Sequence, residues 1–101
     1  MTTVVGWDIG GANTKVARVS GQRVVRARSY PLLLRSDPSQ LVPALREMAR
    51  TIGASASGPH AVTMTAELSR VFRTKREGVR FIVEAMATAF PCAEVAVYAV
   101  E

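Results

Sequence analysis

Residues 4–17 have the sequence VVGWDIGGANTKVA. An apolar run ends at Asp8, a glycine pair follows, and Lys15 precedes a second apolar run. This pattern predicts a β-hairpin whose turn can approach a phosphate, because glycine lacks a Cβ, can take positive φ and lets backbone N–H groups point at an anion. In that interpretation Thr14 adds a hydroxyl, Lys15 adds a cation, and Asp8 could hold a hydrated Mg²⁺. The alternative is an ordinary Gly-Gly hairpin in which Asp8 and Lys15 are solvated strand ends.

The composition indicates one globular domain with a moderately basic surface. The chain has 101 residues, 49% of them hydrophobic, and 13 Lys and Arg against 8 Asp and Glu give a net charge of +5. The basic residues are spread along the sequence and do not alternate with aromatic residues, which gives little support to nucleic-acid binding. An anionic small molecule suits the same charge. The sequence leaves open whether the protein forms oligomers.

The chain contains one cysteine and one histidine, which limits the sites that these residues can form. Cys92 is alone, so no disulfide framework and no cysteine-based metal site is expected, and a packing role is predicted for it. His60 is also alone and follows a Gly-Pro turn, which favours a surface or strand-entry position. The first residues lack the pattern of a signal peptide, and no apolar run is long enough to span a bilayer, so a cytoplasmic location without a membrane partner is expected.

The remaining sequence predicts three strands followed by alternating helices and strands. Strands are expected over residues 2–8, 14–19, 23–34, 60–65 and 94–100. Asp37 and Pro38 are expected to start one helix, which Gly53 ends, and Thr74 to cap a second helix that runs to about residue 90. The order β-β-β-α-β-α-β predicts an α/β fold with a mixed five-stranded sheet, as in a ribonuclease-H-like lobe.

Helical spacing predicts which face of each helix is buried. The first stripe is Leu41, Leu45, Met48, Ala49 and Ile52, and the second is Val79, Ile82, Val83, Met86 and Phe90. Phe81 and the face around Ala85 lie outside the second stripe. They are therefore expected to be available to cover a second lobe.

Two resemblances to known families suggest a function for the hairpin sequence and for two later segments of the chain. Asp8-Ile9-Gly10-Gly11-Ala12-Asn13 resembles the first phosphate-binding hairpin of the sugar kinase, actin and heat-shock ATPase superfamily, with Ala12 where that family often has threonine. Residues 6–15, 62–68 and 74–82 together resemble the hydantoinase/oxoprolinase-like proteins of the tetrahydromethanopterin-linked one-carbon pathway. The enzyme assigned to that family is a transferase of methanofuran biosynthesis. It joins the phenol of γ-glutamyltyramine to an aminomethylfuran diphosphate and releases pyrophosphate.

The resemblance implies a set of site residues. Asp8 and Glu67 would be catalytic, and Asp8 would also hold Mg²⁺. The residues that would bind the diphosphate are Gly10, Gly11, Asn13, Thr14 and Lys15. Family members are longer and have two lobes, so residues 1–101 are expected to form the N-terminal lobe and to need a second lobe as partner. The isolated lobe is expected to be inactive.

Three other functions stay open from the sequence. The chain could be a phosphate- or ATP-binding lobe of another superfamily kinase or hydrolase, or a non-catalytic ligand-sensing lobe. It could also be a metal-dependent nuclease with carboxylates at Asp8, Glu47 and Glu67. Glu47 argues against the nuclease, because at about 100° per residue it lies roughly 145° from the centre of the first apolar stripe and should face solvent.

Overall fold

The computed structural model describes residues 3–31, 37–54, 58–64 and 72–99. Its elements are β1 (Thr3–Ile9), β2 (Asn13–Ser20), β3 (Arg23–Pro31), the 3₁₀ turn η1 (Pro38–Gln40), α1 (Leu41–Thr51), β4 (His60–Met64), α2 (Lys75–Ala89) and β5 (Val95–Ala99). The predicted order of elements is confirmed. The ends of the predicted strands at residues 32–34, 65 and 100 lie outside the described residues.

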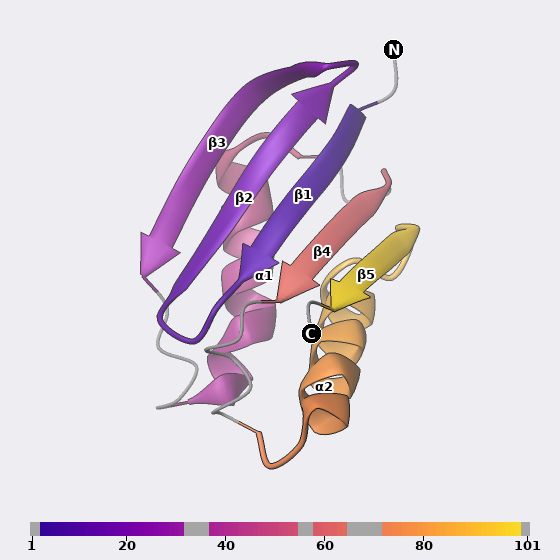
Figure 1. Cartoon of the computed structure of the whole chain (residues 1–101). Coiled ribbons are helices and arrows are strands. Elements are labelled where there is room, and N and C mark those ends of the chain that lie inside the picture. The colour runs from indigo at the N-terminus through magenta and orange to yellow at the C-terminus, as the bar shows by residue number, and fades with distance from the viewer. Residues whose placement is uncertain (1–2, 32–36, 55–57, 65–71, 100–101) are drawn as a thin grey trace.

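The five strands form one mixed sheet in the order β3-β2-β1-β4-β5 (Figure 1). β1 pairs antiparallel with β2, and β2 with β3, whereas β4 is parallel to both β1 and β5. Short turns join the antiparallel strands, and helical crossovers bring the chain back for the parallel ones. The predicted α/β class and five-stranded mixed sheet are therefore confirmed.

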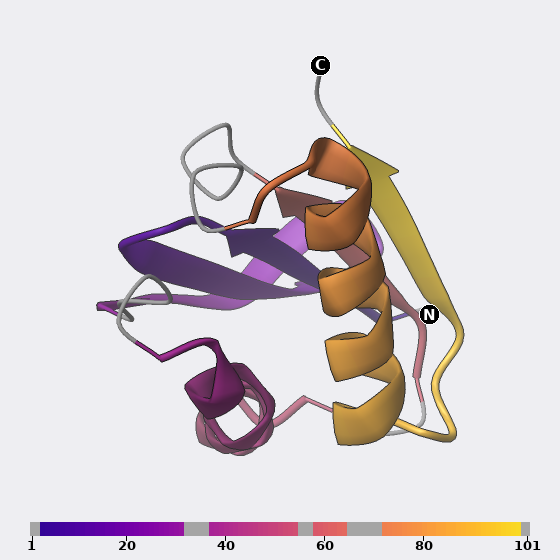
Figure 2. The same cartoon turned by 90° about the horizontal axis from the view of Figure 1, so that it is seen from below.

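Both helices lie on the same face of the sheet (Figure 2). Along β1 the side chains of Val5, Trp7 and Ile9 are buried beneath them, while Gly6 and Asp8 point to the other face. Figure 1 shows that the C-terminal ends of β1, β4 and β5 lie at one edge of the sheet, together with the turn between β1 and β2. The start of α2 lies at this edge as well.

The buried face of α1 is the predicted one, and that of α2 differs from the prediction. Leu41, Leu45, Met48, Ala49 and Ile52 are all buried. In α2 the side chain of Val83 is 45% exposed, whereas Ala85 is only 4% exposed and belongs to the core. The buried residues of α2 are Gly78, Ile82, Ala85, Met86 and Ala89. Three of these five are Gly or Ala, so the helix packs through small residues that a hydrophobicity pattern undervalues.

Phe81 was expected to be free to cover a second lobe. It is half-buried, and its ring packs against that of Phe72 with centroids 5.0 Å apart. The Ala85 face is covered by the core of this chain. The described residues of α2 therefore do not leave the apolar face that was expected there.

The predicted helix ends are confirmed by their hydrogen bonds. Asp37 Oδ1 accepts from the backbone N–H of Ser39 at 3.1 Å, and Thr74 Oγ1 accepts from the N–H of Glu77 at 3.1 Å. These bonds satisfy N–H groups that have no partner within the helix. Gly53 ends α1 with a φ of 70°, a left-handed conformation that suits glycine.

The environments of His60 and Cys92 differ from the predictions. His60 is the first residue of β4, as a strand-entry position requires, but it is only 2% exposed, so a surface position is wrong. Its Nδ1 accepts a hydrogen bond of 2.9 Å from Trp7 Nε1, and its ring stacks on Phe90. The predicted packing role of Cys92 is also wrong, because this residue is exposed in the turn after α2. None of the helices in the described residues is long and apolar enough to cross a membrane.

Candidate functional site

The sheet face opposite the two helices, here called the open face, is covered by no helix or strand of the described residues. Strand alternation places two rows of side chains across it. One is a row of small residues, formed in register by Ala27, Ala17, Gly6, Ala61 and Ala96. Beside it lies a polar row, formed by Ser29, Lys15, Asp8, Thr63 and Tyr98. The open face therefore combines a flat apolar floor with a line of hydrogen-bonding and charged groups.

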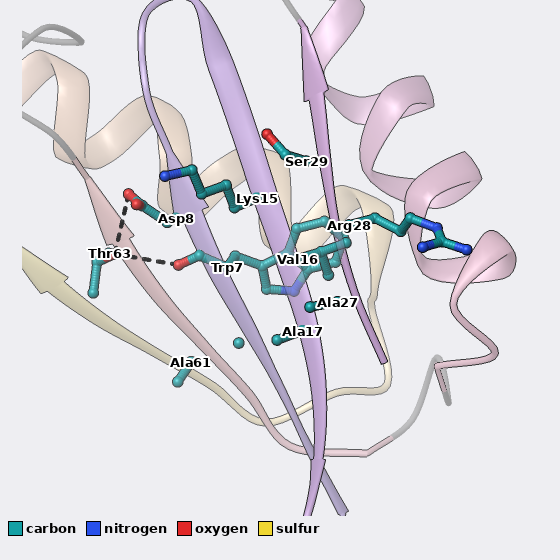
Figure 3. Close-up of a pocket in the computed structure, with 11 residues that line it drawn as sticks. Trp7, Asp8, Lys15, Val16, Ala17, Ala27, Arg28, Ser29, Ala61 and Thr63 are labelled. Carbon is teal, nitrogen blue, oxygen red and sulfur yellow. Dashed lines mark hydrogen bonds between the residues drawn. The ribbon is translucent and has the colours of Figure 1, made fainter. Parts of the chain in front are cut away.

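A hollow of about 580 Å³ lies over these two rows (Figure 3). Gly6 and Ala61 form part of its floor, and Asp8, Lys15 and Thr63 line it. Small side chains create this space, because larger ones in the same register would fill it. The charged groups stand near the edge where β1 and β4 end, and ligands of α/β sheets gather at that edge.

Asp8 lies between a hydroxyl and an ammonium group. It is paired in register with Lys15 on β2 and with Thr63 on β4. The Thr63 hydroxyl lies 3.4 Å from Asp8 Oδ1 and 3.3 Å from the carbonyl oxygen of Trp7, in position to donate to either. Figure 3 shows the Lys15 side chain extending toward Asp8, although the two groups form no ion pair in the described part of the chain. Both charges are therefore available to a ligand.

The turn between β1 and β2 is built differently from the prediction. Neither Gly10 nor Gly11 has a positive φ, so the expected left-handed turn is wrong. The N–H of Gly10 donates to the carbonyl of Asn13 at 2.9 Å and closes the hairpin, which occupies one of the two N–H groups assigned to an anion. Asn13 is exposed at the start of β2.

The structure places Thr14 on the opposite face of the hairpin from Lys15, a predicted phosphate ligand, and from Asp8, the predicted metal ligand. Thr14 is 0% exposed and lies on the helix-covered face, paired in register with Ile9, and its Oγ1 has no hydrogen-bond partner. Asp8 and Lys15 lie on the opposite face of the same hairpin. The hydroxyl of Thr14 could reach a ligand only if the hairpin moved, and its phosphate-binding role stays a prediction.

The two other carboxylates considered from the sequence do not join Asp8 in the described structure. Glu67 lies outside the described residues. Glu47 is exposed on α1, on the helix side of the sheet, and forms an ion pair with Arg50. The hydrogen bond and the positive charge of Arg50 hold the pKa of Glu47 below its usual value. The solvent-facing position expected for Glu47 is confirmed.

Sequence reasoning assigned no site role to three members of the polar row, Ser29, Thr63 and Tyr98. Thr63 lies in the segment 62–68 that carries the family resemblance, but no function was predicted for it. The alternation of buried and half-buried residues along β4 could have placed Thr63 opposite the core. Only the register with β1 brings its hydroxyl to Asp8.

The donor set suits a magnesium ion that arrives with phosphate oxygens. Within the described residues no group of three or more His, Cys, Asp or Glu side chains could enclose a metal ion. Asp8 and the Thr63 hydroxyl offer hard oxygen atoms on the open face. Mg²⁺ is commonly held by one or two carboxylates, substrate phosphates and water, so Asp8 fits this kind of site and not a closed protein cage.

Comparison with curated proteins relates the chain to one synthase. No family model matches it. The chain is 32% identical over 90 residues to (4-{4-[2-(gamma-L-glutamylamino)ethyl]phenoxymethyl}furan-2-yl)methanamine synthase from Methanocaldococcus jannaschii. The match covers 88% of this chain and 25% of the synthase. The chain is thus a distant, partial homologue that spans about a quarter of the length of this relative.

Solved structures with the same fold include two kinases and a protein bound to a Holliday junction. The inorganic polyphosphate/ATP-glucomannokinase from Arthrobacter sp. strain KM matches with a TM-score of 0.69 and 17% identity, over 98% of this chain and 44% of the kinase. The ROK hexokinase from Thermus thermophilus gives 0.68 and 19%, over 97% and 34%. RuvC from T. thermophilus, solved with a Holliday junction, gives 0.61 and 15%, over 98% and 65%. The chain therefore shares the fold of these proteins, a ribonuclease-H-like lobe with a mixed five-stranded sheet.

Proposed function

We propose that this chain is the first lobe of a transferase of methanofuran biosynthesis. The reaction would join the phenol of γ-glutamyltyramine to an aminomethylfuran diphosphate with release of pyrophosphate. The proposal is supported by the partial homology to a synthase whose product contains a phenoxymethylfuran. A second lobe would complete the site from the other side.

The observation that carries the proposal is the pairing of Asp8 with Lys15 on the open face. A diphosphate carries several negative charges, and Lys15 offers an exposed cation to it. The Asp8 carboxylate alone would repel a diphosphate. Its position beside Lys15 is therefore explained best by a metal cation that binds both the carboxylate and the diphosphate. The adjoining hollow offers an apolar floor for a planar aromatic ring.

The chemistry is a displacement at a saturated carbon. The phenol oxygen forms a bond to the methylene carbon of the furan, and the bond from that carbon to the diphosphate oxygen breaks. The electron pair leaves with the diphosphate, and the phenol proton passes to a base. Because negative charge grows on the leaving oxygens, the site needs positively charged and hydrogen-bonding groups placed in advance.

The residues of this chain would divide these tasks. Lys15, the N–H of Gly11 and the amide of Asn13 would bind the diphosphate, with Gly10 shaping the turn between them. Asp8 would hold Mg²⁺, which when bound neutralises charge on the leaving group. Glu67 would accept the phenol proton as general base, unless the second lobe supplies that base.

A binding experiment tests the site on this chain alone. Pyrophosphate is titrated into the 101-residue protein with and without Mg²⁺ by isothermal titration calorimetry. Lys15→Ala should weaken binding about tenfold under both conditions, and Asp8→Asn should abolish the gain from Mg²⁺. Arg23→Ala, which removes one positive charge at the far end of the β2–β3 hairpin, should leave binding within about twofold. If Lys15→Ala and Arg23→Ala weakened pyrophosphate binding equally, the binding would depend only on the net charge of the protein, and the proposed site would be refuted.

A second experiment tests the reaction. The protein with both lobes is incubated with Mg²⁺, γ-glutamyltyramine and aminomethylfuran diphosphate, and the ether and pyrophosphate are followed by mass spectrometry. Ether formation that Asp8→Asn abolishes would support the transferase. Pyrophosphate binding without any ether would instead favour a ligand-sensing lobe. The isolated chain should give no product, because its site is open to water on one side.

A further inference from the structure

Thr63 connects the two strands that meet at the candidate site. Its Oγ1 lies 3.3 Å from the carbonyl oxygen of Trp7 and 3.4 Å from Asp8 Oδ1. Within the described part of the chain, no other hydrogen-bond donor reaches the Asp8 carboxylate. Figure 3 shows the hydroxyl facing both acceptors. Thr63 is thus the described side chain placed to orient Asp8, the carboxylate of this site that the structure describes.

The position of Thr63 is fixed by the sheet and not by a flexible loop. The parallel register places it directly beside Asp8, and Trp7 on the same strand is tied to β4 a second time through its 2.9 Å bond to His60. Thr63 is also β-branched, so few rotamers are open to its hydroxyl. The donor is therefore already in place before a ligand binds.

We propose that Thr63 is a positioning residue that sets the Asp8 carboxylate for a Mg²⁺-bound diphosphate. The inference rests on the proposed function, because it assumes that a diphosphate binds beside Asp8. A hydroxyl has one proton, and with Asp8 ionised that proton is drawn to the carboxylate, since charge-assisted hydrogen bonds are stronger than neutral ones. Asp8 Oδ1 is then held, and the remaining lone pairs of the carboxylate are left for the cation.

This role has a signature that mere structural support lacks. Groups that orient a metal ligand typically change metal affinity by about 10–100-fold when they are removed. The separation of 3.4 Å puts Thr63 at the lower end of that range. Its effect should appear only when Mg²⁺ is present, because Lys15 binds the anion without help from Asp8.

The test uses pyrophosphate as the probe and calorimetry on the 101-residue chain. Thr63→Val replaces the hydroxyl with a methyl group of similar size and should reduce the Mg²⁺-dependent affinity about tenfold, while the affinity without Mg²⁺ stays within about twofold. Thr63→Ser should restore the affinity to within about twofold of the unmodified protein. Thr51→Val, which removes a threonine hydroxyl bonded to Glu47 in α1, is the matched control and should change neither value.

A double-mutant cycle with Asp8→Asn separates positioning from general damage. Thr63→Val should cost nothing further once Asp8→Asn has removed the carboxylate, because the two changes act on one interaction. An equal cost in both backgrounds would overturn the inference, as would a Thr63→Val variant that keeps the full gain from Mg²⁺. If the unmodified chain shows no gain from Mg²⁺, the proposed function and this inference fail together. If that gain is present and unaffected by Thr63→Val, only this inference fails.

Discussion

The hydrogen bond between Trp7 and His60 should contribute a measurable part of the free energy of unfolding. Trp7 is 3% exposed and His60 is 2% exposed, and Nε1 of one donates to Nδ1 of the other at 2.9 Å. Trp7→Phe keeps an aromatic ring beside Phe90, which lies 5.7 Å away, but removes the donor. The change therefore removes one polar contact from an apolar core and also replaces the indole with a smaller ring.

Two effects set the size of the loss. A buried acceptor that loses its donor costs about 1–3 kcal/mol. The smaller ring also loses buried apolar area, which costs about 1–2 kcal/mol. We therefore expect Trp7→Phe to lower the free energy of unfolding by about 2–5 kcal/mol. For a domain of this size that corresponds to a fall in Tm of about 10–25 °C.

A double-mutant cycle identifies the polar contact. His60→Leu removes the acceptor, and the double variant removes both partners, which is close to neutral for the hydrogen bond itself. His60→Leu should therefore cost about 1–3 kcal/mol less in the Trp7→Phe background than in the unmodified protein. Urea unfolding is followed by circular dichroism, because Trp7 is the only tryptophan and its fluorescence is lost in the variant. Tyr98→Phe, at a 60% exposed aromatic residue, should stay within about 0.5 kcal/mol. Additive costs in the cycle would refute the reasoning.

Three further predictions concern α1 and α2. Gly53→Ala should destabilise the protein by about 1–2 kcal/mol in thermal unfolding. The φ of Gly53 is 70°, a left-handed conformation, and a Cβ at this position would lie 3.1 Å from Arg18 Nη1. An unchanged Tm would contradict this prediction. Thr74→Ala should cost about 1 kcal/mol through the lost cap of α2, and Thr74→Ser should stay close to the unmodified protein. Arg50 lowers the pKa of Glu47 in the folded protein. The ion pair therefore stabilises the folded state at pH values above the ordinary carboxyl pKa of about 4.3. This stabilisation is lost as the pH falls through the lower pKa that Glu47 has in the folded protein. The stability difference between Glu47→Gln and the unmodified protein should therefore vanish in acid, and a difference that persisted at pH 2 would exclude this origin.

Much of the fold follows from signals that are local in the sequence. The caps at Asp37 and Thr74, the glycine at position 53 and the apolar stripe of α1 each involve residues only a few positions apart. Such patterns reflect backbone geometry and can be recognised without the tertiary structure. The α2 stripe was predicted less well, because packing through Gly78 and Ala85 depends on how closely the helix approaches its neighbours.

Sequence reasoning missed a contact between distant residues and also misjudged the geometry of a local turn. His60 was expected near the surface because nothing near it in sequence suggests a partner, yet Trp7 donates to it across 53 positions. The glycine pair of the turn was read as a source of positive φ, whereas the hairpin closes through Gly10 and Asn13 without one. Asp8 and Lys15 were each singled out from the hairpin sequence, and the structure pairs them in register across β1 and β2. Their roles toward a ligand stay predictions.

The open face shows why sheet register matters more for this site than any single motif. Its small residues come from five strands, and Gly6 and Ala61 meet only because β1 and β4 are paired in one particular parallel register. A shift of one position would turn the buried side chains toward the open face and remove Thr63 from Asp8. The Trp7–His60 bond and the Thr63 hydroxyl both bridge these two strands, so the contacts that fix the register also assemble the polar row. Stability and ligand binding should therefore be coupled at this strand pair: Trp7→Phe, although its indole lies on the helix side, should weaken the Mg²⁺-dependent binding of pyrophosphate more than an equally destabilising change in α1.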